Sequence, residues 1–387
     1  MKILQVTNMV SHHQLPLAKE LCKLVGEENF LFAAMGKPDQ DRIKSGWKGE
    51  YAEKWIIHPN ETLEENEKFN RFWDEADIVL CGERLISKMQ ERVDQNKICF
   101  YMSERLFKPP LGVLRLCHPA YFKMVLDFRK LSKSEFFHYL PTGPFAAKDM
   151  ALIAPMKNRV WQWGYFTERP SVVRNFTESP ADVVSILWVG RMVKYKRVDL
   201  LINALHRLKS EGKLFRLTLV GEGPERERLQ RLSDKLLGKE YCTIQDFIPS
   251  EEVTALMAKN DVYVLPSNAY EGWGAVVNEA MSVGCAVVVS DKTGAGVSLI
   301  NHGVNGLLFK SGSVDSLYKF LSKVVHNKEL NQDLGIKAIA TVIEAWQPAI
   351  VAERFVALVS VMLNERESVV GIECTGPLSA LNYINNW

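Results

Sequence analysis

"YEGWGAVVNEAMSVGCAVVVS", residues 270–290, contains a glycine-rich loop, a short helical pattern and an apolar run in direct succession. The helix is expected to start near Gly274 and to stop at Gly284, and "GCAVVVS" (284–290) is expected to form the following strand. A second apolar run, "DVYVLPS" (261–267), precedes the loop. Strand, helix and strand in this order are typical of a parallel βαβ unit.

The same alternation continues in both directions from this stretch, which indicates a succession of βαβ units. The segments expected to form strands are 2–7, 29–35, 77–82 and 97–103 in the first half, and 184–190, 215–221, 242–247, 261–267, 284–290 and 305–309 in the second. We therefore predict an α/β protein with two Rossmann-like, doubly wound parallel-sheet domains.

The chain has 387 residues, too many for one ordinary hydrophobic core. A polar stretch with two prolines, between about 165 and 183, is expected to join the domains. We predict one domain over 1–175, a second over 176–345, and a C-terminal helix with a tail over 346–387 that crosses back to the first. Two such domains facing each other leave a cleft at the carboxyl ends of their strands, where open α/β sheets bind ligands.

Composition narrows the class of protein. Hydrophobic residues at 47% and charged residues at 24% are typical of a soluble globular chain. The formal net charge of +2 gives no reason to expect a nucleic acid partner. The seven cysteines are scattered without a CxxC pair, which indicates neither zinc nor a disulfide framework. Because the start "MKILQVTN" is not a signal segment and no apolar run is long enough to span a membrane, we expect the protein in the cytoplasm.

Cations follow the first strand of the second half. In "VGRMVKYKRVD", Gly190 and Arg191 end the strand and Lys196 precedes the next helix. Two cations near a helix N-terminus suit a diphosphate, although a solvated basic loop would have the same sequence.

Two further strands end in weaker signals. "VGEGP" (220–224) lacks the third glycine of a dinucleotide fingerprint, and a tight turn with Pro224 starting the helix explains it. Phe247 and Ile248 could flank a nucleobase or could simply pack in the core.

Two carboxylates stand out in the opening stretch. Glu271 lies in the loop at the positive end of the helix, and Glu279 lies inside the helix. Gly272 and Gly274 allow backbone N–H groups to come close to a ligand. Two carboxylates beside free donors suit a polyhydroxylated ligand, and the alternative is a capping Glu271 with a surface Glu279.

Several motifs of the second half agree in order and spacing with one family. "ILWVGRMVKYKRVDLLINALHRL", "LTLVGEGPERERL", "LPSNAYEGWGAVVNEAMSVGCAVVVSD" and "INHGVNGLLF" together resemble the donor domain of family 4 glycosyltransferases, over roughly 184 to 365. These are retaining enzymes of the GT-B architecture. The resemblance implies that Glu271 contacts sugar hydroxyls of the donor, Glu279 the ribose, and Arg191 and Lys196 the diphosphate. It also implies donor contacts from the backbone of Gly272, Trp273 and Gly274, although the family often has Phe where Trp273 stands.

The first half resembles the family less closely and would hold the acceptor. The glycine pair that usually follows the first strand is replaced by "TNMVSHHQLP", with His12 and His13. After the fourth strand, where many members carry a histidine, this chain has Glu104 and Arg105. These four residues are candidates for contacting the acceptor. The histidines could instead be surface residues, and Glu104 could simply pair with Arg105.

The resemblance implies sugar transfer from a nucleotide-diphosphate sugar to a hydroxyl of a glycan or lipid-linked acceptor, as in cell-surface polysaccharide assembly. We expect no metal or other cofactor, because Arg191, Lys196 and a helix N-terminus can supply positive charge to the leaving diphosphate. The DxD pair, Asp39 and Asp41, is interpreted as solvated. Two other classes remain open: a nucleotide-sugar epimerase or hydrolase, and a non-catalytic nucleotide-sugar binder.

A basic segment follows the fourth strand. In "PAYFKMVLDFRKLSKSEFF" (119–137) an apolar helical face is formed by Tyr121, Val125 and Phe128. One interpretation is an amphipathic helix packed on its own sheet with its lysines in solvent. The other is peripheral contact with an anionic membrane through the cations of this segment and its neighbour, which are Arg115, Lys123, Arg129, Lys130 and Lys133.

Overall fold

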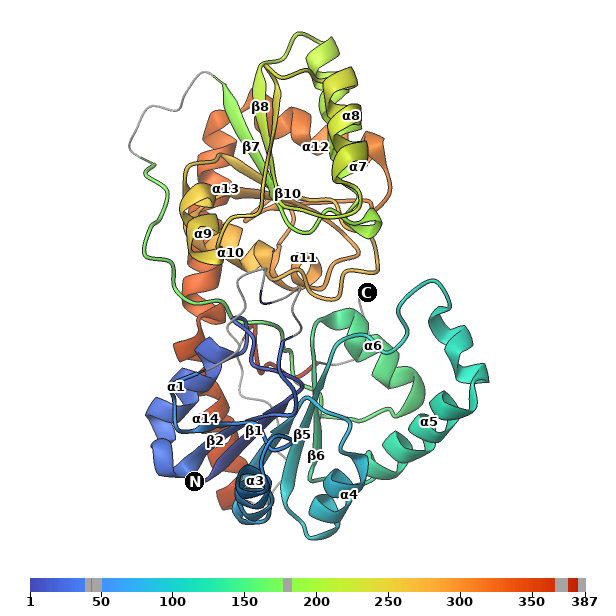
Figure 1. Cartoon of the computed structure of the whole chain (residues 1–387), viewed down its shortest axis with the longest axis vertical. Coiled ribbons are helices and arrows are strands. Elements are labelled where there is room, and N and C mark those ends of the chain that lie inside the picture. Colours follow the sequence, from blue (N-terminus) through green and yellow to red (C-terminus); the bar gives the residue numbers. More distant parts are fainter. Residues whose placement is uncertain (39–42, 44–50, 177–182, 366–374, 382–387) are drawn as a thin grey trace. The chain divides into compact units, whose positions relative to one another are not determined.

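The computed structural model describes residues 1–38, 43, 51–176, 183–365 and 375–381 (Figure 1). The chain divides into two compact units. Unit 1 comprises Met1–Glu168 and Ala345–Trp387, and unit 2 comprises Arg169–Glu344. Asp39 and Asp41 lie outside the described residues.

The sheet of unit 1 has six parallel strands in the order β3-β2-β1-β4-β5-β6. From β1 the chain first adds strands on one side and then returns to add them on the other, so β1 and β4 flank the switch point of a doubly wound sheet. The strands are β1 (Ile3–Thr7), β2 (Phe30–Ala34), β3 (Ile56–Ile57), β4 (Ile78–Cys81), β5 (Ile98–Ser103) and β6 (Phe137–Pro141).

Helices cover both faces of this sheet. Residues of α3, α4, α5 and α6 form one core cluster with alternate strand residues such as Val79 and Tyr101. On the opposite face α1 packs beside α14, and the Phe355 ring of α14 lies 5.3 Å from that of Phe100 on β5. The helical elements are α1 (Leu15–Val25), η1 (Glu27–Asn29), α3 (Leu63–Glu75), α4 (Ile86–Asp94), η2 (Gly112–Cys117), α5 (Pro119–Leu131), α6 (Pro144–Ile153) and α14 (Pro348–Glu365).

Unit 2 repeats the architecture with a second six-stranded parallel sheet, in the order β12-β11-β10-β7-β8-β9. Its switch point lies between β7 and β10. Residues of α7, α8 and α12 form the core on one face, and Figure 1 shows α9 and α10 away from α7 and α8. The elements are β7 (Val184–Val189), η3 (Lys194–Lys196), α7 (Val198–Ser210), β8 (Phe215–Val220), α8 (Arg226–Leu236), β9 (Cys242–Gln245), α9 (Ser250–Ala258), β10 (Val262–Leu265), α10 (Val276–Val283), β11 (Ala286–Ser290), α11 (Gly294–Leu299), β12 (Leu307–Phe309), α12 (Val314–His326) and α13 (Lys328–Thr341).

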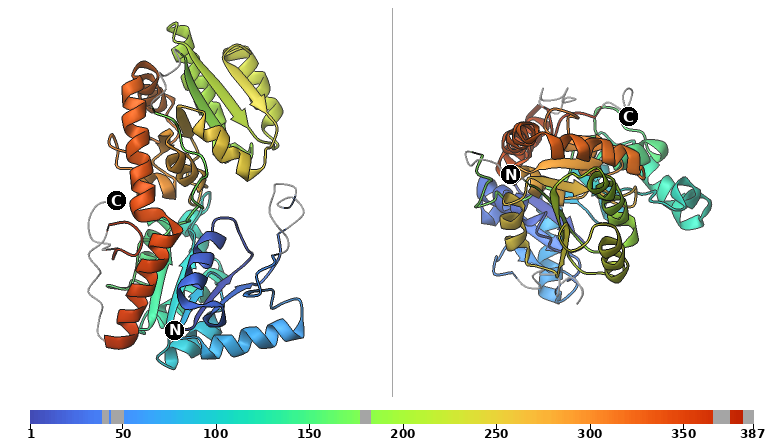
Figure 2. Two further views of the ribbon diagram at one scale, coloured as in Figure 1. Left: turned by 90° about the vertical axis from the view of Figure 1, so that its left-hand side faces the viewer. Right: turned by 90° about the horizontal axis from the view of Figure 1, so that it is seen from above.

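The C-terminal segment is part of unit 1. Figure 2 shows the long helix α14 in orange-red, and its residues Val351, Phe355 and Leu358 are fully buried. By length and composition alone, the helical run Lys328–Asn364 could cross a membrane. Because these α14 residues are buried in the core of unit 1, α14 has the environment of a core helix and not that of a membrane span. After α14, Ala380 bridges to Trp161 in antiparallel fashion and Leu378 is buried, so the tail adds a short pairing that the sequence did not indicate.

The predicted α/β fold with two doubly wound parallel sheets is confirmed. All ten expected segments contain a strand, but β3 and β6 were not predicted. The described cysteines are free, and burial raises the pKa of the Cys81 and Cys285 thiols to about 12. The helix predicted over 119–137 ends at Leu131, and β6 begins at Phe137.

Candidate functional site

The switch point of the unit 2 sheet is where a ligand site is expected from the fold. Strands β7 and β10 are hydrogen-bonded neighbours there, and the connections that follow them run to opposite sides of the sheet. The loop after β7 carries Gly190, Arg191 and Lys196, and the loop after β10 carries Glu271. The fold therefore brings together at one edge residues that are 75 positions apart in the sequence.

The loop after β7 is held by the glycine turn after β8. The Met192 N–H donates to the Glu222 carbonyl at 2.7 Å, and the Glu225 N–H donates back to Met192 at 3.0 Å. A Cβ at Gly223 would clash with the Met192 carbonyl oxygen, so this close approach requires glycine. The "VGEGP" turn thus positions the cationic loop. Pro224 does not start the helix as predicted, because α8 begins at Arg226.

A buried ion pair joins the two loops of the switch point. The Nζ of Lys196 lies 2.6 Å from Oε2 of Glu271, and the two side chains are 13% and 12% exposed. Burial alone would lower the pKa of Lys196, but the Glu271 carboxylate outweighs it and the pKa is raised. A backbone hydrogen bond of 2.9 Å from the Asn268 N–H to the Tyr195 carbonyl ties the loops together beside the pair. Lys196 is therefore a fixed cation, and Glu271 a fixed acceptor.

The residues after Glu271 are fixed by contacts with α10 and α11. The Trp273 indole is buried and its Nε1–H donates to Oδ1 of Asn278 at 2.8 Å, so the ring packs inside the unit. The carbonyls of Gly272 and Trp273 accept hydrogen bonds from Gly294 and Ala295. Gly274 has φ of 88°, and a Cβ there would lie 2.8 Å from the Leu265 side chain. The loop shape thus depends on Gly274.

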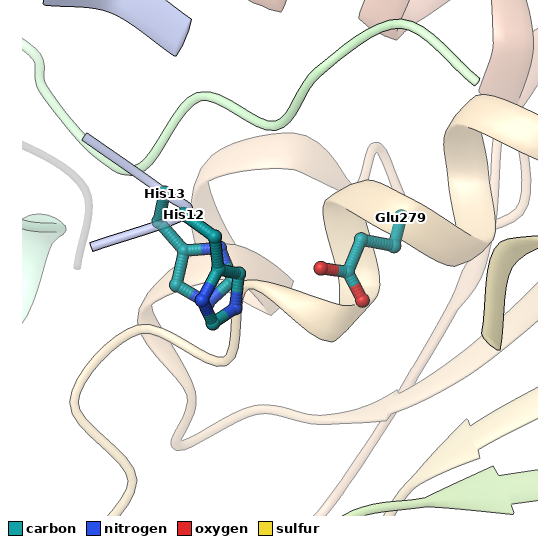
Figure 3. Close-up of side chains that lie close together, drawn as sticks. All are labelled: His12, His13 and Glu279. Atoms are coloured by element: carbon teal, nitrogen blue, oxygen red, sulfur yellow. The ribbon is translucent and has the colours of Figure 1, made fainter. Parts of the chain in front are cut away.

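Glu279 lies in the first turn of α10, which ends at Gly284 in the left-handed conformation. Figure 3 shows its carboxylate projecting from the helix. Burial raises the pKa of Glu279 to about 7. A second acceptor therefore follows Glu271 at a fixed place on the helix.

The other donor-side candidates are accessible. Arg191 is exposed on the loop after β7. Phe247, in the loop after β9, is 43% exposed, and Ile248 is half-buried, so neither residue belongs to the buried core. The alternative that these two residues are ordinary core packing is wrong for Phe247.

Unit 1 has a cavity of about 490 Å³ at its own switch point. Strand β1, the loops after β1, β4 and β5, and the segment after α6 contribute polar groups to its wall, among them Gln5, Ser11, His13, Glu83, Glu104 and Tyr165. The Gln5 Oε1 and His13 Nδ1 atoms are buried without a hydrogen-bond partner among the described residues. Because buried polar atoms normally have partners, these two atoms mark the cavity as a place for a hydrogen-bonding ligand or water.

Glu104 and Arg105 do not pair with each other, so that alternative is wrong. Glu104 accepts a hydrogen bond from the Tyr165 hydroxyl at 2.9 Å and lies 2.5 Å from Nζ of Lys108. Burial and the Glu104 charge raise the pKa of Tyr165 well above its ordinary value. Arg105 lies 3.4 Å from Asp149 on α6 and is absent from the residues that line the cavity. Of the two, Glu104 alone lines the cavity among the described residues.

The two histidines lie against each other, with ring centroids 3.8 Å apart (Figure 3). His13 also stacks on Tyr165 at 5.6 Å and lines the cavity. Burial, and for His13 the neighbouring His12 charge, lower the pKa of both imidazoles. His13 is therefore a neutral imidazole at neutral pH, a hydrogen-bonding group rather than a charge.

Sequence reasoning missed Gln5, Lys108 and Tyr165. Gln5 is a polar residue in the interior of a buried strand, and this is the signal that could have found it. Tyr165 lies 61 residues from Glu104, so its contact with Glu104 follows only from the fold.

A chain of two doubly wound units, with a cation and a carboxylate paired at the switch point of the second, has the GT-B architecture of glycosyltransferases. The structure of Anabaena Alr3699/HepE in complex with UDP has this fold: it aligns with a TM-score of 0.66 and 16% identity over 93% of this chain and 100% of that one. At this identity the likeness concerns the fold alone.

The sequence of unit 2 is similar to a family of known proteins. Residues 173–341 match the model of the family "Glycosyl transferases group 1". An uncharacterized glycosyltransferase of Haemophilus influenzae is 30% identical over 178 residues, which cover 42% of this chain and 48% of that protein. The putative colanic acid biosynthesis glycosyltransferase WcaL of Escherichia coli is 33% identical over 128 residues, 32% of this chain and 30% of that one. The matches thus span less than half the length of these relatives.

Proposed function

We propose that the protein is a retaining glycosyltransferase that moves a sugar from a nucleotide-diphosphate sugar to a hydroxyl of a glycan or lipid-linked acceptor. The observation that carries the proposal is the buried Lys196–Glu271 pair at the unit 2 switch point. It supplies one fixed cation for a diphosphate and one fixed acceptor for sugar hydroxyls, in the part of the chain that matches the group 1 family.

On the donor side, the leaving diphosphate gains negative charge in the transition state. Lys196 and the exposed Arg191 stabilise that charge without reorganisation, because the glycine turn after β8 already holds their loop. Glu271 accepts from hydroxyls of the transferred sugar, and Glu279 from the ribose. Phe247 and Ile248 flank the base. The Anabaena protein of the same fold is described in complex with UDP, which supports a nucleotide-diphosphate donor.

On the acceptor side, the unit 1 cavity receives the hydroxyl-bearing group. Its wall offers the Glu104 carboxylate, the Gln5 side-chain carbonyl and the neutral His13 imidazole. Such acceptors hydrogen-bond to hydroxyl groups, which suits a sugar. His12 and Arg105 are not among the residues that line the cavity, so we assign the acceptor contacts to His13 and Glu104.

The proposal includes metal-independent transfer, because protein cations serve the leaving group. It also places the enzyme in the cytoplasm, at the inner face of the membrane, in cell-surface polysaccharide assembly. The similarity to the colanic acid glycosyltransferase supports that setting.

A radiolabel-transfer assay tests the proposal. The purified protein is incubated with a panel of nucleotide sugars, with and without a membrane-glycolipid extract as the source of acceptor. We expect label to move into the glycolipid fraction with one donor, and the transfer to fall at least tenfold, about 1.4 kcal/mol, in Lys196→Ala. Free or isomerised sugar formed equally without acceptor would instead establish a hydrolase or an epimerase. Tight nucleotide-sugar binding without any turnover would establish a binder.

A further inference from the structure

An unusual group of exposed apolar side chains lies before and on α5. Between residues 111 and 126, five large hydrophobic side chains are more than half exposed: Leu111, Val113, Leu114, Phe122 and Leu126, at 55%, 52%, 66%, 61% and 51%. We call these five residues the η2/α5 surface. They form more than a quarter of the eighteen large hydrophobic residues exposed in the described parts of the chain, so exposed apolar residues are concentrated in this segment.

Helix α5 is apolar on two sides. Its inner side, with Met124, Val125 and Phe128, packs in the unit 1 core. The helical repeat places Phe122 and Leu126 on the other side, where they are exposed. A helix that folded only to cover its sheet would have a polar outer side. The apolar outer side therefore indicates a second contact that α5 makes outside this chain's own core.

The element that precedes α5 has further exposed apolar side chains. Elements η2 and α5 are in contact, and Leu116 of η2 packs against the unit 1 core. This anchor leaves Leu111, Val113 and Leu114 outward. Figure 1 shows α5, in teal, at the outer edge of unit 1, on the side of the sheet away from α1.

Positive charge surrounds the apolar residues. From 111 to 133 the chain has five Lys and Arg residues and one carboxylate, Asp127. Lys123 pairs with Asp127 at 2.7 Å, while Arg115 donates to the Tyr121 hydroxyl at 2.6 Å and Arg129 to the Ile153 carbonyl at 3.0 Å. Lys130, in the last turn of α5, and Lys133, just after the helix, are exposed. The cations thus border the surface, but contacts within the unit already engage three of them.

We infer that the η2/α5 surface inserts into the headgroup region of an anionic membrane. Apolar side chains bordered by lysine and arginine suit the boundary between acyl chains and anionic headgroups. Because Asp127 and the internal contacts reduce the available charge, the apolar side chains contribute most of the binding. This differs from a purely electrostatic attachment through the lysines. The inference gives the proposed membrane location a specific surface, and it does not rest on the transfer chemistry.

Vesicle flotation of the full-length protein tests the inference. The vesicles are phosphatidylcholine alone or mixed with phosphatidylglycerol. We expect binding to the anionic vesicles, and a partition coefficient at least tenfold lower for Phe122→Ser/Leu126→Ser. The matched control is Leu214→Ser/Ile336→Ser in unit 2, whose residues are 61% and 52% exposed and which should bind like the wild type. Lys130→Glu/Lys133→Glu should lower the coefficient by a smaller factor and remove most of its salt dependence.

A labelling measurement keeps the test valid if a serine variant folds poorly. Cys117 is exposed at the end of η2, while the other described cysteines are buried. An environment-sensitive fluorophore on Cys117, in a Cys374→Ser background, should shift to the blue with anionic vesicles. No binding to anionic vesicles, or equal binding by wild type and the Phe122/Leu126 variant, would overturn the inference. So would a concentration-dependent dimer that the same variant abolishes while vesicles have no effect, because the surface would then join two copies of the chain.

Discussion

Removing one partner of the Lys196–Glu271 pair should destabilise unit 2 more than removing both. At 2.6 Å and an effective dielectric constant near 20, the gross attraction is about 6 kcal/mol. Desolvation of two side chains that are 13% and 12% exposed offsets much of it. Glu271→Met or Lys196→Met alone leaves a buried, uncompensated charge, which costs about 3 to 5 kcal/mol. The double variant should lie within about 1 kcal/mol of the wild type, because no charge remains unpaired.

Two-state unfolding is not expected for a chain of two units, so the assay should be local. Hydrogen exchange in peptides that cover β7 and β10 reports opening of the switch point. The matched control is Glu227→Gln, which breaks the Glu227–Arg231 pair at 3.6 Å, with side chains 88% and 73% exposed, and should change exchange by less than about 0.5 kcal/mol. Equal effects from the Lys196 variant and the exposed control would refute the reasoning.

Three further predictions concern ligand binding, the leaving group and pH. Glu279→Ala should weaken nucleotide binding about tenfold or more in calorimetry, whereas the exposed Glu329→Ala should not; equal affinities would remove Glu279 from the donor site. Arg191→Ala should lower kcat more than it raises KM, and transfer should persist in excess EDTA; complete loss that magnesium restores would contradict the metal-independent account. Burial and the nearby Arg159 charge lower the pKa of His138 to about 3, so between about pH 6.5 and that value the unfolded state binds one more proton. The free energy of unfolding of unit 1 should therefore fall by about 1.4 kcal/mol for each pH unit on acidification. His138→Asn should lose this slope while the exposed His326→Asn retains it, as hydrogen exchange in peptides that cover β5 and β6 at several pH values can determine.

The second half was the more predictable part of the chain. Its strands, the Gly284 end of α10 and the loops with Lys196 and Glu271 all follow from local patterns, because a parallel βαβ unit has a regular sequence signal. The ion pair itself did not follow. Resemblance assigned Lys196 to the diphosphate and Glu271 to the sugar, and spacing along the chain says nothing about a contact between loops 75 residues apart.

The first half was less predictable for two physical reasons. Strand β3 has two residues, too few for a period-two pattern, and β6 follows the α5 pattern so closely that the segment was interpreted as one helix. Glu104 and Arg105 are adjacent in sequence, yet their partners Tyr165 and Asp149 are 61 and 44 residues away. Only the fold determines which adjacent side chain enters the cavity.

The central claim is that the unit 2 switch point binds the diphosphate and sugar of a nucleotide sugar. The most direct measurement is a crystal structure with a non-transferable nucleotide-sugar analogue. The account predicts diphosphate oxygens within hydrogen-bond distance of Lys196 and Arg191, a sugar hydroxyl on Glu271, and ribose hydroxyls on Glu279. A nucleotide bound elsewhere, with the Lys196–Glu271 pair still closed and no ligand atom against either residue, would contradict it.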